Sequence, residues 1–144
     1  NIRVKNLIKK ETKIIKNLSL KFKQLRRVNN KNKNMVKKLI DSCKKEGKTI
    51  YGFGASVGST TLVYDFELNK RINYIFDNEK KRYNLYMPGT KIKVLNPYLI
   101  KKMKIDYILI FAWRYAKQIL IKNKNLFSKN TKFILPLPKF RIIK

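Results

Sequence analysis

The stretch Thr49–Thr61, TIYGFGASVGSTT, combines residue types that can bind an anion. Its apolar start predicts a buried strand, followed by a glycine-rich turn and a helix that begins on a hydroxyl residue. Glycine lets the backbone approach a ligand closely, and a helix start offers unpaired N–H groups to negative charge. The candidate ligand-binding residues here are Gly52, Gly54, Ser56, Gly58 and Ser59. If Gly54 faces the ligand, a bulky residue there should block binding and leave the sheet intact. The spacing G-x-G-x-x-x-G departs from the dinucleotide-binding G-x-G-x-x-G, so a purely structural tight turn is an equal alternative.

Three further candidates follow apolar runs that predict strands. Asp77 comes directly after Ile72–Phe76, and an acid at the tip of a second strand either accepts a ribose hydroxyl or caps the next turn. Trp113 and Arg114 follow Asp106–Ala112. The tryptophan either stacks on a base or sugar or packs in the core, and the arginine either pairs with a diphosphate or remains a solvated charge.

Catalytic side chains and metal ligands are scarce in this chain. It has no histidine and one cysteine. That composition removes the usual general base, the usual metal ligand, Ser–His and Cys–His pairs, and an internal disulfide. We therefore predict no catalytic residue and no metal site.

The net charge of +28 raises the question of nucleic-acid binding. The basic residues are spread along the whole chain, mostly as lysine, and lysine, isoleucine and asparagine all have A/T-rich codons. A dedicated nucleic-acid-binding protein more often gathers its basic residues on one face. We expect weak, salt-sensitive binding to polyanions and no specific nucleic-acid partner.

The elements that must position these residues alternate between strand and helix. This alternation predicts an α/β fold with a Rossmann-like open, mainly parallel sheet and flanking helices. The expected strands are 49–51, 72–76, 91–95, 106–112 and, last in the chain, 131–136. Because parallel strands end at a common edge of the sheet, the candidate residues should lie together at that edge.

Residues 1–46 are predicted as a helical lead segment and residues 47–144 as the Rossmann-like domain. The lead carries an apolar stripe at helical spacing, and the asparagine-rich stretch 29–34 predicts two helices or one interrupted helix. No apolar run is long enough to span a membrane, and no signal peptide is evident. We therefore expect a cytoplasmic protein with no membrane partner.

Five segments in this order resemble one family. They are GFGAS, FDNEKKR, MPGTKIKV, DYILIFAWRYAKQI and TKFILPLP. Over about residues 35–143 the chain resembles the C-terminal domain of S-adenosylmethionine (SAM)-dependent sugar C-methyltransferases. The resemblance implies that the chain binds a nucleotide-diphosphate sugar. The matching substrate-side positions are the GFGAS turn, Asp77, the Pro88–Gly89 turn and Trp113.

In that family a zinc-binding domain and a SAM-binding domain precede this one. The chain has neither the zinc cysteines nor a second glycine-rich strand–helix unit. The resemblance therefore implies that these residues neither bind SAM nor transfer a methyl group alone, and that the two other domains of the same protein are their partners. The family often has lysine where Val57 stands, asparagine at Ser59 or Thr60, histidine at Lys91 and asparagine at Arg114. The sugar and the nucleotide therefore stay open, as do two alternatives: a stand-alone nucleotide- or dinucleotide-binding module, and a basic nucleic-acid-binding protein.

Overall fold

A six-stranded sheet in the order β3-β2-β1-β4-β5-β6 forms the centre of the chain's larger unit. The structure is a computed structural model that describes residues 1–144. Its helices and strands are α1 (Ile2–Lys45), β1 (Ile50–Phe53), α2 (Val57–Asp65), β2 (Tyr74–Phe76), β3 (Lys93–Leu95), β4 (Tyr107–Ile110), α3 (Ala116–Lys122), β5 (Lys132–Leu135) and β6 (Arg141–Ile143). Short 3-10 helices, η1 (Lys80–Arg82), η2 (Pro97–Lys102), η3 (Trp113–Tyr115) and η4 (Lys124–Leu126), connect them.

The first five strands are parallel, and β6 pairs antiparallel with β5. The predicted α/β class with a Rossmann-like, mainly parallel sheet is confirmed. From β1 the chain builds outward through β2 to β3 and then returns to place β4 on the other side of β1. The carboxyl ends of β1 and β4 therefore form the topological switch point, where open α/β sheets bind their ligands.

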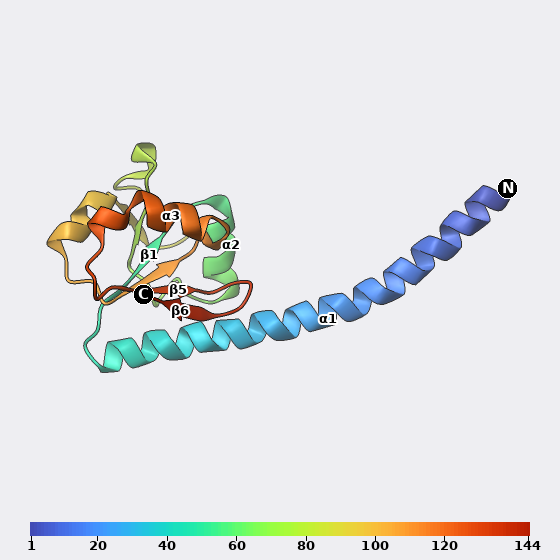
Figure 1. The fold of residues 1–144 in the computed structure, drawn as a ribbon, viewed down its shortest axis with the longest axis horizontal. Coiled ribbons are helices and arrows are strands. Elements are labelled where there is room, and N and C mark those ends of the chain that lie inside the picture. Colours follow the sequence, from blue (N-terminus) through green and yellow to red (C-terminus); the bar gives the residue numbers. More distant parts are fainter. The chain divides into compact units, whose positions relative to one another are not determined.

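Side chains alternate between the two faces of the sheet, and helices cover both (Figure 1). On β4, Leu109 packs with α2 and the end of α1, whereas Ile108 and Ile110 pack with α3 and η2. All four β4 residues are buried, as expected for a central parallel strand covered on both faces. The sheet is therefore buried on both faces beneath the switch point.

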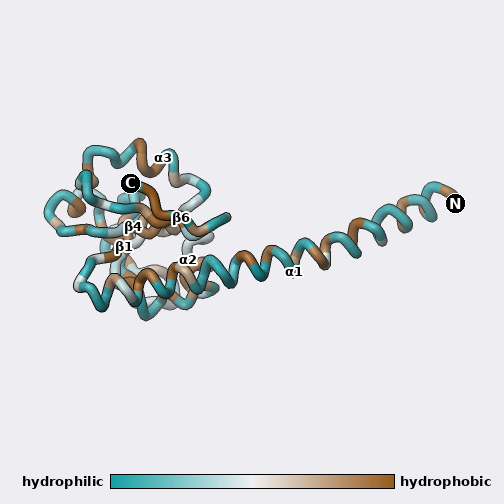
Figure 2. The backbone as a smooth tube through the Cα atoms, turned by 60° about the horizontal axis from the view of Figure 1, so that its bottom comes forward, coloured by the Kyte–Doolittle hydropathy of each residue, from teal (hydrophilic) through white to brown (hydrophobic).

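The prediction of two helices or one interrupted helix in the lead is wrong, because α1 runs unbroken from Ile2 to Lys45. Asparagine usually weakens a helix because its side chain competes for the helix's own backbone. Here the buried Asn32 amide forms hydrogen bonds with the segment between β5 and β6 instead. Its Nδ2 donates to the Pro138 carbonyl at 2.9 Å, and its Oδ1 accepts from the Phe140 N–H at 3.1 Å. Apolar and polar residues alternate along the helix (Figure 2).

The chain consists of two compact units, Asn1–Lys31 and Asn32–Lys144, and the boundary between them falls within α1. The second unit contains the sheet together with the last part of α1. No helix, α1 included, has the length and apolar character needed to cross a membrane.

The expectation that 131–136 is the last strand is also wrong. After β5 the chain turns back, with Asn32 holding both the Pro138 carbonyl and the Phe140 N–H, and β6 pairs with β5. A strand of three residues shows no hydrophobic period that the sequence could reveal.

Glu67, just after α2, forms ion pairs with the part of α1 that belongs to the larger unit. Its carboxylate pairs with Lys33 and Lys37, and these hydrogen bonds lower the pKa of Glu67 to about 2. A carboxyl group whose folded-state pKa is depressed stabilises the fold above its unfolded pKa, and this contribution is lost as the pH falls from about 4.3 towards 2.

Glu67→Gln is therefore expected to make stability less sensitive to acid. The measurement compares urea midpoints at about pH 6 and about pH 3 for the wild type and the variant. Glu11→Gln, which removes a carboxyl from the smaller unit, should keep the wild-type acid sensitivity. Equal acid losses in wild type and Glu67→Gln would show that this ion pair does not contribute.

Candidate functional site

The turn between β1 and α2 is closed by its own hydroxyl groups. Ser56 caps α2, with its Oγ accepting from the Ser59 N–H at 3.3 Å. The Ser59 hydroxyl is fully buried, donates to the Gly54 carbonyl and lies 2.9 Å from Ser56 Oγ. The Ser59 hydroxyl is thus used within the turn. Ser56, in contrast, lines the two cavities described below.

Two of the predicted glycines are required by packing. A Cβ added to Gly52 would lie 2.6 Å from the Phe111 ring. Gly54 has φ +94°, its N–H donates to the Phe76 carbonyl at 2.7 Å, and an added Cβ would lie 2.5 Å from Ala112 Cβ. The expectation that a bulky residue at Gly54 leaves the sheet intact is therefore wrong, because this glycine joins three strand ends. Gly58 differs: a Cβ added there would meet only Ser56 Oγ, at 3.9 Å, which is an ordinary van der Waals contact.

Asp77, directly after β2, accepts a hydrogen bond from the same turn. Its buried carboxylate accepts from the Ala55 N–H at 2.5 Å and the Glu79 N–H at 2.7 Å, and Arg82 Nη1 lies 3.2 Å from Oδ2. Both oxygens are thus engaged by the protein itself. Of the two roles the sequence left open, the capping role is the one these contacts describe.

Trp113 and Arg114 stand in η3, at the end of β4. The Arg114 guanidinium carbon lies 4.2 Å from the centre of the Trp113 ring, in cation–π geometry. Trp113 is half-buried against the core cluster that includes α2, and Arg114 is exposed. The stacked ring restrains the arginine while leaving its N–H donors accessible.

These elements enclose a cavity of about 220 Å³ at the carboxyl ends of β1 and β4, which we call the switch-point cavity. It is lined by Ser56, Gly58, Phe111, Ala112, Trp113, Arg114 and Tyr115. It thus brings together four of the eight predicted site residues, whereas Gly52, Gly54, Ser59 and Asp77 hold the turn in shape behind it. A hydroxyl, a helix start, a guanidinium and aromatic rings, with no acid among them, suit an anion attached to a sugar or base.

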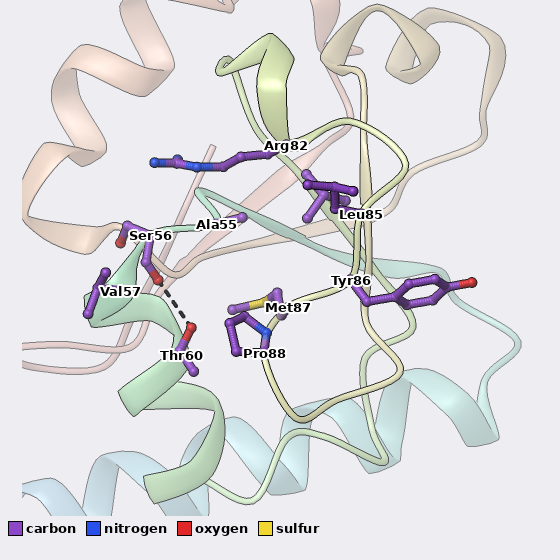
Figure 3. A pocket seen from close by; sticks show the side chains of 10 residues that line it. Ala55, Ser56, Val57, Thr60, Arg82, Leu85, Tyr86, Met87 and Pro88 are labelled. Atoms are coloured by element: carbon purple, nitrogen blue, oxygen red, sulfur yellow. Dashed lines mark hydrogen bonds between the residues drawn. The ribbon is translucent and has the colours of Figure 1, made fainter.

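A second cavity of about 280 Å³, which we call the side cavity, lies between the start of α2 and the segment before β3 (Figure 3). It is lined by Ala55, Ser56, Val57, Thr60, Arg82, Leu85, Tyr86, Met87, Pro88 and Val94. Ser56 and Pro88 belong to turns that the resemblance already placed on the substrate side, whereas Arg82 was not among the predicted site residues. Arg82 lies five residues after Asp77, in the segment FDNEKKR, and is the sole arginine there among lysines. An arginine among lysines is a residue type that suits phosphate binding, but its contact with Asp77 cannot be read from the sequence.

No group of three or more His, Cys, Asp or Glu side chains comes together in the chain. At the carboxyl edge of the sheet, the two cavities are lined by hydroxyl groups, arginines and aromatic rings.

Comparison with known proteins agrees with this architecture. The family described as C-methyltransferase C-terminal domain matches residues 1–138. The chain is also similar to the C-methyltransferase NovU of Streptomyces niveus, with 28% identity over 109 residues. That alignment covers 75% of this chain and 26% of the relative, so the chain spans about a quarter of the relative's length. With nearly its whole length matched, the chain belongs to the family of C-methyltransferase C-terminal domains.

Proposed function

We propose that this chain is the substrate-binding part of a cytoplasmic, SAM-dependent C-methyltransferase, and that it holds a nucleotide-diphosphate sugar at the carboxyl edge of its sheet. The zinc-binding and SAM-binding domains of the same protein would complete the active site. On this proposal the chain alone does not transfer a methyl group.

The switch-point cavity is the observation that carries the proposal. Arg114 approaches it from the end of β4, and Ser56 with Gly58 approaches it from the start of α2. Backbone N–H groups and the dipole of a helix start favour an anion by about 0.3–1 kcal/mol, and a guanidinium matches the geometry of phosphate oxygens. These groups together suit the diphosphate of a nucleotide sugar, with Trp113 and Tyr115 offering ring surfaces beside it.

The residues present do not fit SAM. In nucleotide-binding folds an acid at the tip of the second strand accepts the ribose hydroxyls. Here that acid is Asp77, and its oxygens are engaged by Ala55, Glu79 and Arg82. The chain also has a single glycine-rich turn. We therefore assign SAM to another domain of the enzyme, and no step of the chemistry to these residues.

Arg114→Ala is expected to weaken the binding of dTDP or UDP to the 144-residue chain by about tenfold, and to leave the binding of thymidine or uridine unchanged. A hydrogen bond to a charged phosphate contributes about 1.5–3 kcal/mol, and only the diphosphates carry that charge. NMR titration or calorimetry measures the four affinities.

The control is Arg141→Ala, which removes an exposed arginine of β6 that lines neither cavity. Equal weakening by both variants would mean that only the net positive charge attracts the nucleotide. If no nucleotide perturbs residues 52–60, 77 or 113–114, the site is wrong, while membership of the family stands.

A further inference from the structure

A third cavity, of about 450 Å³, lies between α3 and the start of β5. It is lined by Thr131, which directly precedes β5, and by Lys144, which follows β6. Since β6 runs antiparallel to β5, the end of β6 lies beside the start of β5. This is the end of β5 opposite to the carboxyl edge, and the cavity shares no lining residue with the switch-point cavity or the side cavity. It is therefore separate from the candidate site, and we call it the lysine cavity.

The apolar wall of the lysine cavity is formed by Leu120 and Ile121 of α3, by Phe127 and by Phe133 of β5. The rings of Phe127 and Phe133 pack edge to face, with their centres 4.8 Å apart. Phe133 is buried, whereas Ile121 is 67% exposed. Ligand pockets in proteins are typically lined by such side chains and have volumes of about 300–1,000 Å³. The wall therefore suits an aromatic or short aliphatic group that covers the exposed part of Ile121.

The charge of the lysine cavity has a single sign. Its charged side chains are Lys124, Lys129 and Lys144, and no acidic residue lines it. Along the chain, residues 107–144 contain nine lysine and arginine residues and no aspartate or glutamate. None of the ion pairs in the protein includes the three lysines of the cavity. Their ammonium groups therefore have no carboxylate partner in the chain, and they favour a ligand that carries negative charge.

The extent of the apolar surface favours a small ligand over a protein partner. A stable protein interface buries about 800 Å² on each side and has apolar residues at its centre. Among residues 116–144, however, Ile121 and Ile142 are the only large apolar residues that are exposed, and Ile142 does not line the cavity. The apolar surface that a partner could cover in this region is thus largely confined to the cavity.

We propose that the lysine cavity binds a small carboxylate that carries an aromatic or short aliphatic group. The apolar group lies against Ile121, Phe127 and Phe133, and the carboxylate meets Lys124 and Lys129. This site goes beyond the proposed function, because it lies at the opposite end of β5 and involves neither the nucleotide nor its sugar. The small carboxylate should therefore bind without competing with a nucleoside diphosphate.

Three probes separate the parts of this chemistry. The first, 3-phenylpropionate, has the ring and the charge, 3-phenylpropanol has the ring alone, and acetate has the charge alone. Each probe is titrated into the 144-residue chain and followed by two-dimensional NMR. We expect 3-phenylpropionate to perturb residues 120–133 and to bind about fivefold more tightly than the alcohol, because only the anion is attracted by the lysines. Acetate should leave these residues unchanged, since it has no ring to bury against the apolar wall.

Two matched pairs of variants locate the site. Lys124→Glu should weaken 3-phenylpropionate by about fivefold, whereas Lys117→Glu makes the same change in net charge at an exposed position of α3 outside the cavity and should have little effect. Ile121→Ala should weaken the same probe by about fivefold, because part of the wall is lost. Ile142→Ala, at an exposed position of β6, should leave it unchanged. Urea midpoints close to that of the wild type show that all four variants fold.

Several results would contradict this inference. One is an alcohol that binds as tightly as the carboxylate, and another is equal weakening by Lys117→Glu and Lys124→Glu, which would mean that only net charge attracts the anion. A third is a response of residues 120–133 to a peptide with phenylalanine between glutamates but not to 3-phenylpropionate, since the cavity would then belong to a protein-binding surface. Displacement of 3-phenylpropionate by dTDP would show that the two sites are not separate. Each of these results leaves the proposed function standing, because nucleotide binding at residues 52–60, 77 and 113–114 tests that function independently.

Discussion

Gly54→Ala is expected to destabilise the fold by about 2–5 kcal/mol, the largest effect that we predict for a single methyl group in this chain. Gly54 has φ +94°, where a side chain costs about 1–2 kcal/mol. The added Cβ would also lie 2.5 Å from Ala112 Cβ and 3.1 Å from the Ala112 nitrogen. Relieving such overpacking costs a further 1–3 kcal/mol or so, because the end of β4 must move away from β1.

The same turn supplies the control. Gly58 lies in α2, where an added Cβ makes only an ordinary van der Waals contact, so Gly58→Ala should be neutral or stabilise the fold by about 0.5–1 kcal/mol. Urea denaturation of the two variants and the wild type gives the comparison. A Gly54→Ala protein as stable as Gly58→Ala would show that the end of β4 is free to yield, and that Gly54 is not needed for packing.

Asp77→Asn should cost about 2–4 kcal/mol of stability. The carboxylate gives one oxygen to the Ala55 N–H and the other to the Glu79 N–H, in a buried position. An asparagine retains one acceptor oxygen and turns an NH₂ group toward the other N–H. One backbone donor is then left buried without a partner, and the charge-assisted strength of the remaining bond is lost.

A second consequence concerns binding. Ala55 belongs to the turn that lies between the switch-point cavity and the side cavity, so loosening it should also weaken nucleoside diphosphates, with broadened NMR signals at 54–59. The matched control is Asp41→Asn, whose carboxylate forms an ion pair with Arg71 and is half exposed. Exposed pairs contribute about 0–1 kcal/mol, so this variant should remain close to wild type. If Asp77→Asn unfolds at the same urea concentration as Asp41→Asn, Asp77 does not hold the turn.

The sequence alone was sufficient for the fold class and for the sheet edge at which the candidate residues lie. The apolar run Asp106–Ala112 predicted a strand, and β4 (Tyr107–Ile110), with all four residues buried, lies within it. The alternation of strand and helix predicted the parallel sheet, which then placed the turn after β1 and Trp113–Arg114 at one edge. Hydrophobic period and turn residues are local properties, so they can be read along the chain.

The roles of individual polar residues and glycines were decided by the tertiary structure. Ser59, Asp77 and Gly54 have residue types that suit a ligand, yet the structure uses them to close the turn. Asn32 has a type that suits a helix end, yet it holds the β5–β6 turn from the middle of α1.

Sequence distance is the physical reason for this difference. The Asp77 carboxylate meets a backbone N–H 22 residues away, and the Asn32 amide meets a carbonyl 106 residues away. A polar side chain forms its hydrogen bonds within the protein if the fold places donors and acceptors within about 3 Å of it. Otherwise its hydrogen-bonding groups remain available to a ligand. Only the packing of distant segments determines that, and this is why Arg82 could be recognised as a candidate only once the side cavity was formed.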